Sequence, residues 1–200
     1  MKNSEWGASA YLAQSSYGKN AEVWINNSSS CITGSAGNSA SAGTDAGTTN
    51  DYTNSQGVQA STTGNVTGIY DMSGGAWEYT AAYVNNGHGN LQSYGAALVN
   101  GAAKTKDMYS SATSSGANTQ SQDYETAKGK YGDAVYETSN TYSSGSGSWY
   151  NDCSGLPCID APFFLRGGSY RNGANAGSFY FNCDNGSALS NGFRPVLVIL

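Results

Sequence analysis

The sequence is poor in charge and in the residue types that most catalytic and metal sites require. Charged residues make up 12% of the 200 positions, roughly half of their usual share in soluble proteins, and His88 is the single histidine. With 9 basic residues against 14 acidic ones the formal net charge is -5. We therefore expect no nucleic-acid partner, which would need clustered Lys and Arg. No apolar run reaches membrane-spanning length, so no direct membrane insertion by this chain is expected.

Cysteine occurs at four positions, never in the CxxC spacing of zinc sites. Cys153 and Cys158 bracket a short Ser-Gly-Leu-Pro turn that a disulfide can close, while Cys31 and Cys183 either pair or stay free. We expect disulfides or free thiols and no cofactor, with a structural calcium ion left open. The N-terminal residues lack the apolar stretch of a signal peptide. Polarity and the possible disulfide favour an extracellular or cell-surface location, with any targeting segment outside this chain.

The chain is rich in tyrosine and in small polar residues. Its 15 Tyr, 5 Phe and 4 Trp are spread along the sequence and supply material for a core, which disordered chains of low charge usually lack. The length suits a single domain over 1–200. Surfaces of Tyr, Ser, Gly and Asn are typical of adaptable recognition sites, because Tyr provides contact area at little cost in side-chain entropy.

Regular secondary structure is expected to be sparse. The spacing of apolar residues predicts a helix over 4–15 and a weaker one over 77–83. The Ser-, Gly-, Asn- and Thr-rich stretches 26–63 and 110–122 are predicted to be loops. Short strands are predicted over 22–25, 66–70, 163–165, 178–181 and 195–200. The last of these is continuously apolar and is expected to be a central strand. The predicted fold class is α+β, loop-rich with little regular secondary structure.

Two segments carry motifs of a known family. Residues 64–79 read GNVTGIYDMSGGAWEY, and residues 164–198 read FLRGGSYRNGANAGSFYFNCDNGSALSNGFRPVLV. Together they resemble the formylglycine-generating-enzyme branch of the C-type lectin fold, which carries N-x-x-G-x-x-D-M-x-G-N-V-W-E-W and later R-G-G-S and G-F-R. The matching positions are Asp71, Met72, Gly74, Trp77, Glu78, Arg166, Gly167, Gly168, Ser169, Gly192, Phe193 and Arg194. The opening MKNSEWGASAYLAQSSYG is similar to the start of such domains in Gram-positive gut bacteria.

These matching residues are expected to be scaffold. Trp77 lies close to Gly74 and Gly75, which suits a bulky ring that enters the core where the backbone approaches closely. Asp71 and Glu78 are candidate buried partners for Arg166 and Arg194, because an arginine and a carboxylate satisfy each other through two parallel hydrogen bonds.

The resemblance does not extend to the chemistry of the family. Sulfatase-activating members carry a reactive cysteine pair after R-G-G-S, at the positions of Asn172 and Gly177 here, and neither residue is cysteine. Other enzymatic relatives hold iron with three histidines, whereas this chain has His88 alone. No G-x-S-x-G, P-loop or H-E-x-x-H motif occurs. We therefore expect a protein that is not an enzyme, with an enzyme of this branch as the disfavoured alternative.

The C-terminal segment also resembles the variable region of diversity-generating retroelement proteins, a further branch of this fold. In those proteins adenine-directed mutation of AAC codons for Asn cannot create Lys, Glu, Gln, Met or Trp. None of these five types occurs from 159 to 200, although the preceding 158 positions hold about two dozen. The resemblance implies that 164–194 is diversified to change binding specificity, with Cys183 as an accidental product. A Gly- and Asn-rich segment that simply lacks long side chains is the alternative.

The contact residues follow from the two-residue alternation of a strand. If Phe179 and Phe181 face the core, their neighbours face solvent. The predicted ligand-binding residues are Tyr170, Arg171, Asn172, Asn175, Ser178, Tyr180, Asn182, Cys183, Asp184, Ser187, Leu189 and Ser190. Tyr170, Tyr180 and Arg171 are the expected energetic anchors. The predicted function is a surface-displayed binding protein for a protein or cell-surface ligand, and the alternative is a structural pilus-tip or cell-wall module without a selected ligand.

Overall fold

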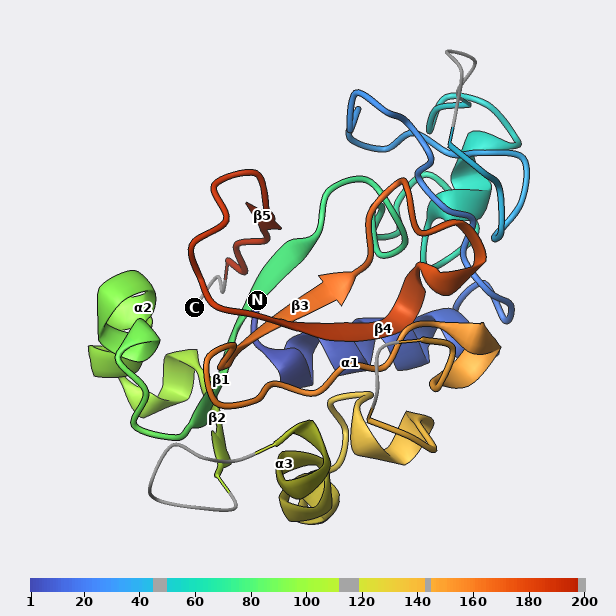
Figure 1. Cartoon of the computed structure of the whole chain (residues 1–200). Coiled ribbons are helices and arrows are strands. Elements are labelled where there is room, and N and C mark those ends of the chain that lie inside the picture. Colours follow the sequence, from blue (N-terminus) through green and yellow to red (C-terminus); the bar gives the residue numbers. More distant parts are fainter. Residues whose placement is uncertain (45–49, 112–118, 143–144, 198–200) are drawn as a thin grey trace.

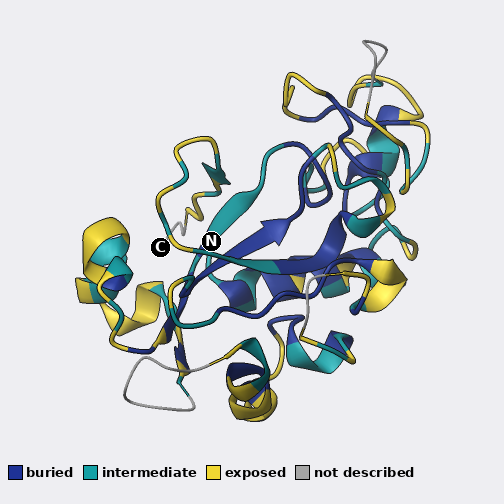
Figure 2. Ribbon diagram, viewed as in Figure 1, coloured by how far each residue is buried: buried dark blue, intermediate teal, exposed yellow. Residues whose placement is uncertain are grey.

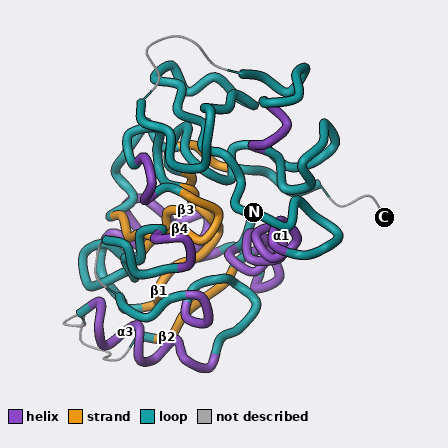
Figure 3. The backbone as a smooth tube through the Cα atoms, turned by 90° about the vertical axis from the view of Figure 1, so that its right-hand side faces the viewer, coloured by secondary structure: helices purple, strands orange, loops and turns teal. Residues whose placement is uncertain are grey.

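A small mixed sheet surrounded by helices and long loops makes up the fold (Figure 1). The computed structural model describes residues 1–44, 50–111, 119–142 and 145–197. The α-helices in these residues are α1 (Asn3–Gln14), α2 (Asn90–Asn100) and α3 (Gln120–Thr126). Short 3-10 helices span Gly57–Ala60, Ala103–Thr105, Ala127–Gly129, Tyr136–Thr138, Trp149–Asn151 and Gly173–Asn175. The predicted α+β class, rich in loops, is confirmed, and Figure 3 shows how much of the chain is loop.

The sheet has the strand order β2-β1-β3-β4, and β5 pairs with β1. The strands are β1 (Glu78–Asn85), β2 (Asp107–Ser110), β3 (Phe163–Gly167), β4 (Gly177–Asp184) and β5 (Gly192–Phe193). β3 runs antiparallel to both β1 and β4, whereas β2 and β5 run parallel to β1. The predicted strands over 163–165 and 178–181 are therefore confirmed as parts of β3 and β4.

Both faces of β3 and of the first part of β4 are covered, as their dark colour in Figure 2 shows. Phe163 packs with Tyr83 of β1 and Leu91 of α2, whereas Phe164 packs in a second cluster with Val84 and Tyr124. Because successive residues of a strand point to opposite faces, α2 and α3 cover different faces of the sheet. Burial on both faces explains why β3 is a continuous apolar run without alternation.

The first helix confirms the prediction over 4–15, apart from a shift of one residue at each end. Trp6, Ala10 and Ala13 are fully buried, and their spacing places them on one face of α1. The Lys2 N–H donates to the Glu5 carboxylate (2.8 Å) and so satisfies one amide at the helix start. The Trp6 Nε1–H donates to the Ser178 carbonyl (2.8 Å), which fixes α1 against β4.

Several other predicted elements are wrong. Residues 78–83 form most of β1 instead of a helix, since Tyr79, Thr80 and Tyr83 fit a strand that is paired on both sides. Residues 22–25 and 66–70 form no strand. The predicted loop 110–122 runs into α3, which begins at Gln120, and its residues 112–118 lie outside the described part of the chain.

The predicted central strand at 195–200 is also wrong where the structure describes it. Val196 and Leu197 lie in an irregular segment, and Leu197 is 86% exposed. An apolar run becomes a core strand only when neighbouring strands cover it. Here the strand that pairs with β1 is the short β5, which ends before residue 195. Residues 198–200 lie outside the described part of the chain. In the part of the chain that is described, no helix has both the length and the apolar character needed to cross a membrane.

Candidate functional site

The loops next to the sheet enclose a small cavity with a volume of about 260 Å³. Four separate segments of the chain form its walls. The lining residues are Cys31, Gly75, Ala76, Trp77, Ser169, Tyr170, Arg171 and Ser190. Tyr170, Arg171 and Ser190 belong to the predicted contact set, and the other five were missed because they come from motifs that sequence reasoning assigned to the scaffold or to loops.

Two glycine turns build one wall of this cavity. Gly74 and Gly75 have φ angles of 77° and 69°, and Gly167 has 79°, a region in which side-chain-bearing residues are strained. The Gly74 N–H donates to the Gly167 carbonyl (2.9 Å), and the Tyr170 N–H donates to the Gly75 carbonyl (2.8 Å). The DMSGG and RGGS motifs therefore contact each other, and this contact places Tyr170 over the cavity.

The turn that follows β3 is closed by Asn172. Its Oδ1 accepts from the Ser169 N–H (2.7 Å) and from the Ser169 hydroxyl (3.1 Å). The Arg171 N–H donates to the Ser169 Oγ (3.3 Å). Asn172 was predicted to contact a ligand, but its side-chain oxygen is used inside the turn, and it acts by holding Tyr170 and Arg171 in place.

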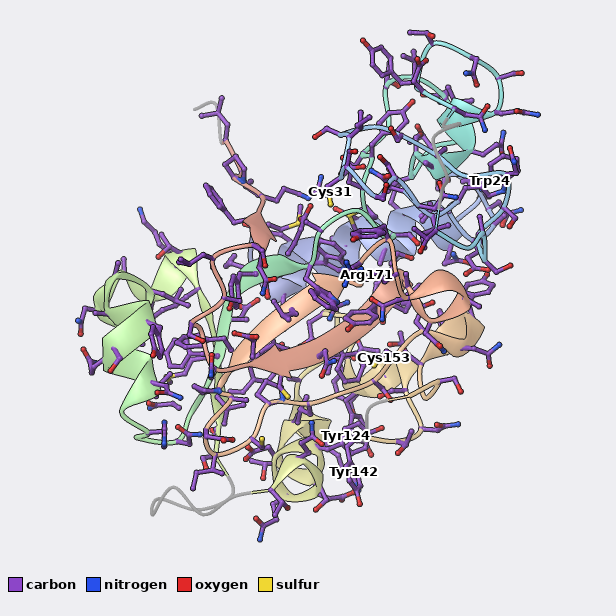
Figure 4. The ribbon with its side chains drawn as sticks, turned by 45° about the horizontal axis from the view of Figure 1, so that its top comes forward. Trp24, Cys31, Tyr124, Tyr142, Cys153 and Arg171 are labelled. Carbon is purple, nitrogen blue, oxygen red and sulfur yellow. The ribbon has the colours of Figure 1, made fainter. Side chains whose placement is uncertain are left out.

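Tyr170 and Arg171 are hydrogen-bonded neighbours in the lining of the cavity, and Figure 4 labels Arg171. The Arg171 Nε–H donates to the Tyr170 hydroxyl (2.8 Å), and the guanidinium carbon lies 5.2 Å from the centre of the Tyr170 ring. Arg171 is exposed. Across the residues that the structure describes, its guanidinium makes no salt bridge. The remaining guanidinium N–H groups are therefore available to an incoming carboxylate.

The prediction that Ser178 and Tyr180 face solvent is wrong. Each is only 1% exposed, because a second layer covers the face opposite Phe179 and Phe181. The Tyr180 hydroxyl accepts from the Trp77 Nε1–H (3.1 Å), and burial raises the pKa of Tyr180 to about 12. Tyr180 is thus a buried support beneath Trp77 and not a contact residue.

The remaining predicted residues do not join this cavity. Asn175 donates to the Asn151 carbonyl (2.9 Å), and Asn182 donates to the Tyr180 hydroxyl (3.2 Å). Ser187 and Leu189 are exposed on the loop between β4 and β5. The sequence predicted that these twelve positions form one exposed patch, and in the structure they do not.

A larger cavity of about 590 Å³ lies between α2 and β5. Its lining residues are Tyr79, Thr80, Tyr94, Gly95, Ala97, Leu98, Phe163, Gly186 and Phe193. Asp184, a predicted contact residue, accepts a hydrogen bond from the Tyr79 hydroxyl and another from the Gly186 N–H (2.7 Å). The volume and apolar lining fall within the range of ligand pockets. Sequence reasoning missed this cavity because its walls come from β1, α2, β3 and the C-terminal loops.

Of the carboxylates predicted as partners for Arg166 and Arg194, Glu78 pairs with Arg194, whereas Arg166 donates to the Ala134 carbonyl (3.1 Å) instead. The Arg194 Nη2–H donates to Glu78 Oε1 (2.7 Å) and its Nε–H to Glu78 Oε2 (3.0 Å). Burial raises the pKa of Glu78 even though Arg194 opposes that shift. The predicted role of Asp71 is wrong, because its carboxylate accepts from the side chain of Asn26 (2.7 Å) and the N–H of Gly34 (3.1 Å). The one bond between Asp71 and Arg194 is accepted by the backbone carbonyl of Asp71 and not by its carboxylate.

Trp77 also differs from its prediction. Its ring is half-buried in the wall of the small cavity and does not enter the core. Its Nε1–H donates to the Tyr180 hydroxyl, so Trp77 contributes the apolar surface of its ring to the cavity. Trp77 differs from a core tryptophan because its neighbour is the exposed loop segment around Tyr170. No local sequence pattern predicts that neighbour.

The cysteines are all free thiols. Cys153 is buried, and its thiol lies near enough to the Tyr180 side chain for each to influence the pKa of the other. Cys31 is exposed and lines the small cavity (Figure 4). The side chains of Cys158 and Cys183 lie near enough for each to influence the pKa of the other. The fold therefore brings together neither of the two pairs considered from the sequence, and Cys183 has a defined neighbour.

A buried polar network lies under the sheet on the side of α1. The Tyr109 hydroxyl donates to the Asp133 carboxylate and accepts from the Asn3 side-chain amide (3.0 Å). Burial raises the pKa of Asp133 from 3.8 to about 6. Arg166 lies close enough to oppose that shift, and burial lowers its own pKa to about 10.

We expect the unfolding free energy to fall as pH rises from about 4 to about 6. In that window the folded state keeps a proton on Asp133 that the unfolded chain releases, so this contribution is complete below the unfolded pKa and is lost above the folded pKa. Asp133→Asn should flatten the slope of melting temperature against pH. Asp152, whose pKa burial also raises, leaves a residual slope of the same sign. An unchanged slope in Asp133→Asn would contradict the assignment.

Among the described residues, no group of three or more His, Cys, Asp or Glu side chains is placed to hold a metal ion. The Nδ1 of His88 accepts from the Asn90 N–H (3.2 Å) at the start of α2. Comparison of the chain with protein-family models, with curated proteins and with solved structures finds no match.

Proposed function

We propose that the chain is a non-catalytic, surface-displayed binding domain of the formylglycine-generating-enzyme type of the C-type lectin fold. The observation that carries this proposal is the Tyr170–Arg171 pair in the lining of the small cavity. An exposed guanidinium that is already ordered on an aromatic ring loses little entropy when it binds, and such groups dominate interface hot spots. The ligand we propose is a protein or cell-surface molecule that brings a carboxylate to Arg171 and an apolar group to Trp77.

The two positions at which enzymatic relatives carry cysteines support a non-catalytic role. Asn172 uses its side chain to close the turn at Ser169. Gly177 has no room for a side chain, because a Cβ atom there would lie 2.1 Å from the Asp152 carboxylate. The chain therefore holds, at both positions, residues that serve the fold.

The division of 164–194 into buried and exposed positions supports diversification by a retroelement. Positions 164–168 and 176–181 are buried, whereas Arg171, Leu189 and Ser190 are exposed. Substitution of exposed residues usually changes stability by no more than about 0.5 kcal/mol, so this segment can vary at its surface while the scaffold persists. We propose on this basis that such variation changes the ligand. The gene tests this: a near-identical repeat that differs from codons 164–194 only at its adenines supports the proposal, and a locus without one overturns it.

The binding proposal predicts a loss of ligand in Arg171→Ala. Immobilised chain would be probed with an array of purified bacterial surface proteins and with intact bacterial cells. Each ligand that the wild-type chain retains should bind at least about tenfold more weakly to Arg171→Ala, the scale of one hot-spot contact. Tyr17→Ala, at a residue that is 90% exposed, is the matched control and should bind like wild type. Equal retention by Arg171→Ala and wild type would overturn the site, and an array that retains nothing would favour the structural module.

A further inference from the structure

Cys158 and Cys183 bring two thiols together from segments that are 25 positions apart in the sequence. Cys183 lies near the end of β4, and Cys158 lies in the turn that precedes β3. Their side chains lie near enough for each to influence the pKa of the other. Both residues are partly accessible to solvent, so small oxidants can reach them.

The backbone fixes both cysteines independently of their thiols. The segment before Cys158 runs alongside β4: Ser154 forms a parallel bridge with Phe181, and the Gly155 N–H donates to the Phe181 carbonyl (2.8 Å). On the other side Cys158 pairs with Ala161 through two backbone hydrogen bonds of 3.2 Å. Residue 164 of β3 then pairs directly with Cys183. Each cysteine is thus held within a few residues of a hydrogen-bonded ladder, and these ladders hold the two segments side by side.

The surroundings keep the reduced pair stable and slow to react. The Gln120 side-chain amide donates to the Cys183 sulfur (3.5 Å), and the Cys158 thiol donates to the Asp160 carboxylate (3.8 Å). Burial raises the pKa of Cys183 to about 11 and, with Asp160, also raises the pKa of Cys158. Because the thiolate is the reactive form, oxidation should be slow at neutral pH and faster at alkaline pH.

We propose that Cys158 and Cys183 are an oxidation site that closes to a disulfide and ties β4 to the segment before β3. With a low-molecular-weight disulfide as oxidant, the Cys158 thiolate attacks one of its sulfurs and expels the first small thiolate. The Cys183 thiolate then attacks the Cys158 sulfur of the mixed disulfide and expels the second. The two protein thiols lose two electrons and two protons in total, and the oxidant leaves as two thiols.

The cross-link would act on the larger cavity. Asp184, the residue after Cys183, accepts hydrogen bonds from Tyr79 and Gly186, which both line that cavity. A bond at Cys183 therefore fixes the strand end from which this wall is built. This inference does not depend on the proposed binding function, because it rests on the thiols and on the backbone around them.

The test is oxidation of the full chain by oxidised glutathione at pH 8.5. Intact mass should fall by about 2 Da with no glutathione retained, since each disulfide removes two hydrogens. Peptide mapping should link Cys158 to Cys183. The melting temperature should rise by roughly 5–10 °C and return after reduction, because the bond closes a loop of moderate length.

The variants separate this pair from the other thiols. Cys31→Ser should keep the mass loss and the thermal shift, whereas Cys158→Ser and Cys183→Ser should lose both. Each variant is compared in its reduced form with reduced wild type, so that a folding defect is seen separately. A wild-type chain that gains only glutathione adducts, or a Cys158→Ser chain that still forms an internal disulfide, would overturn the proposal.

Discussion

Replacing Tyr180 with alanine is expected to lower the free energy of unfolding by about 3–5 kcal/mol, the usual cost of deleting a buried aromatic ring. Tyr180 is 1% exposed and is among the largest fully buried side chains. Its removal leaves a cavity beneath Trp77 and takes away the acceptor of the Trp77 and Asn182 donors. Chemical denaturation followed by Trp fluorescence measures the loss, and the melting temperature should fall by roughly 6–20 °C.

Two further variants show how much of the loss comes from the ring, how much from its hydroxyl, and how much depends on burial. Tyr180→Phe keeps the ring but leaves two partly buried donors without their acceptor, which should cost about 1–3 kcal/mol. Tyr17→Ala removes a ring that is 90% exposed and should change stability by no more than about 0.5 kcal/mol. If Tyr180→Ala behaved like Tyr17→Ala, the ring would be a surface group, as strand alternation alone predicts.

Local patterns predicted the elements that depend on local sequence. The spacing of Trp6, Ala10 and Ala13 was enough for α1, because a helix face is a property of neighbouring turns. The aromatic runs at Phe163 and Phe179 were enough to place β3 and β4. Glu78 was one of the two carboxylates that the sequence offered to Arg194, and the pairing of β1 with β5 is what selects it.

The predictions that were wrong depend on which segments pack over a strand, and local sequence does not show that. Alternation correctly sets Tyr180 opposite Phe181, but it cannot show that Trp77 and the chain near Cys153 cover that side as well. The apolar run at Leu197 was misjudged for the same reason, because no described strand covers it. Neither cavity was predicted, since each is walled by segments that are distant in sequence and meet only after the sheet forms.

Replacing Arg166 with methionine is expected to lower the free energy of unfolding by about 3–5 kcal/mol at pH 7.5. This is the usual effect of removing one partner from a pair of buried charges. Arg166 is fully buried, donates to the Ala134 carbonyl (3.1 Å) and lies over the ring of Trp6 (5.7 Å). Its charge stabilises the ionised form of Asp133 and of Asp152. Methionine keeps much of the volume, so the expected loss is mainly electrostatic.

The pH dependence distinguishes this electrostatic loss from a packing defect. Without Arg166 the ionised Asp133 loses the larger of the two positive charges that stabilise it, the other being Lys130, and its pKa should rise above the wild-type value of about 6. At pH 5 the carboxyl is protonated in both proteins, so the difference in unfolding free energy should shrink. Adding Asp133→Asn to Arg166→Met should recover part of the loss at pH 7.5, because the two side chains are coupled. A loss that is the same at pH 5 and pH 7.5, with no recovery in the double variant, would assign the role of Arg166 to its contacts with Trp6 and the Ala134 carbonyl instead of to its charge.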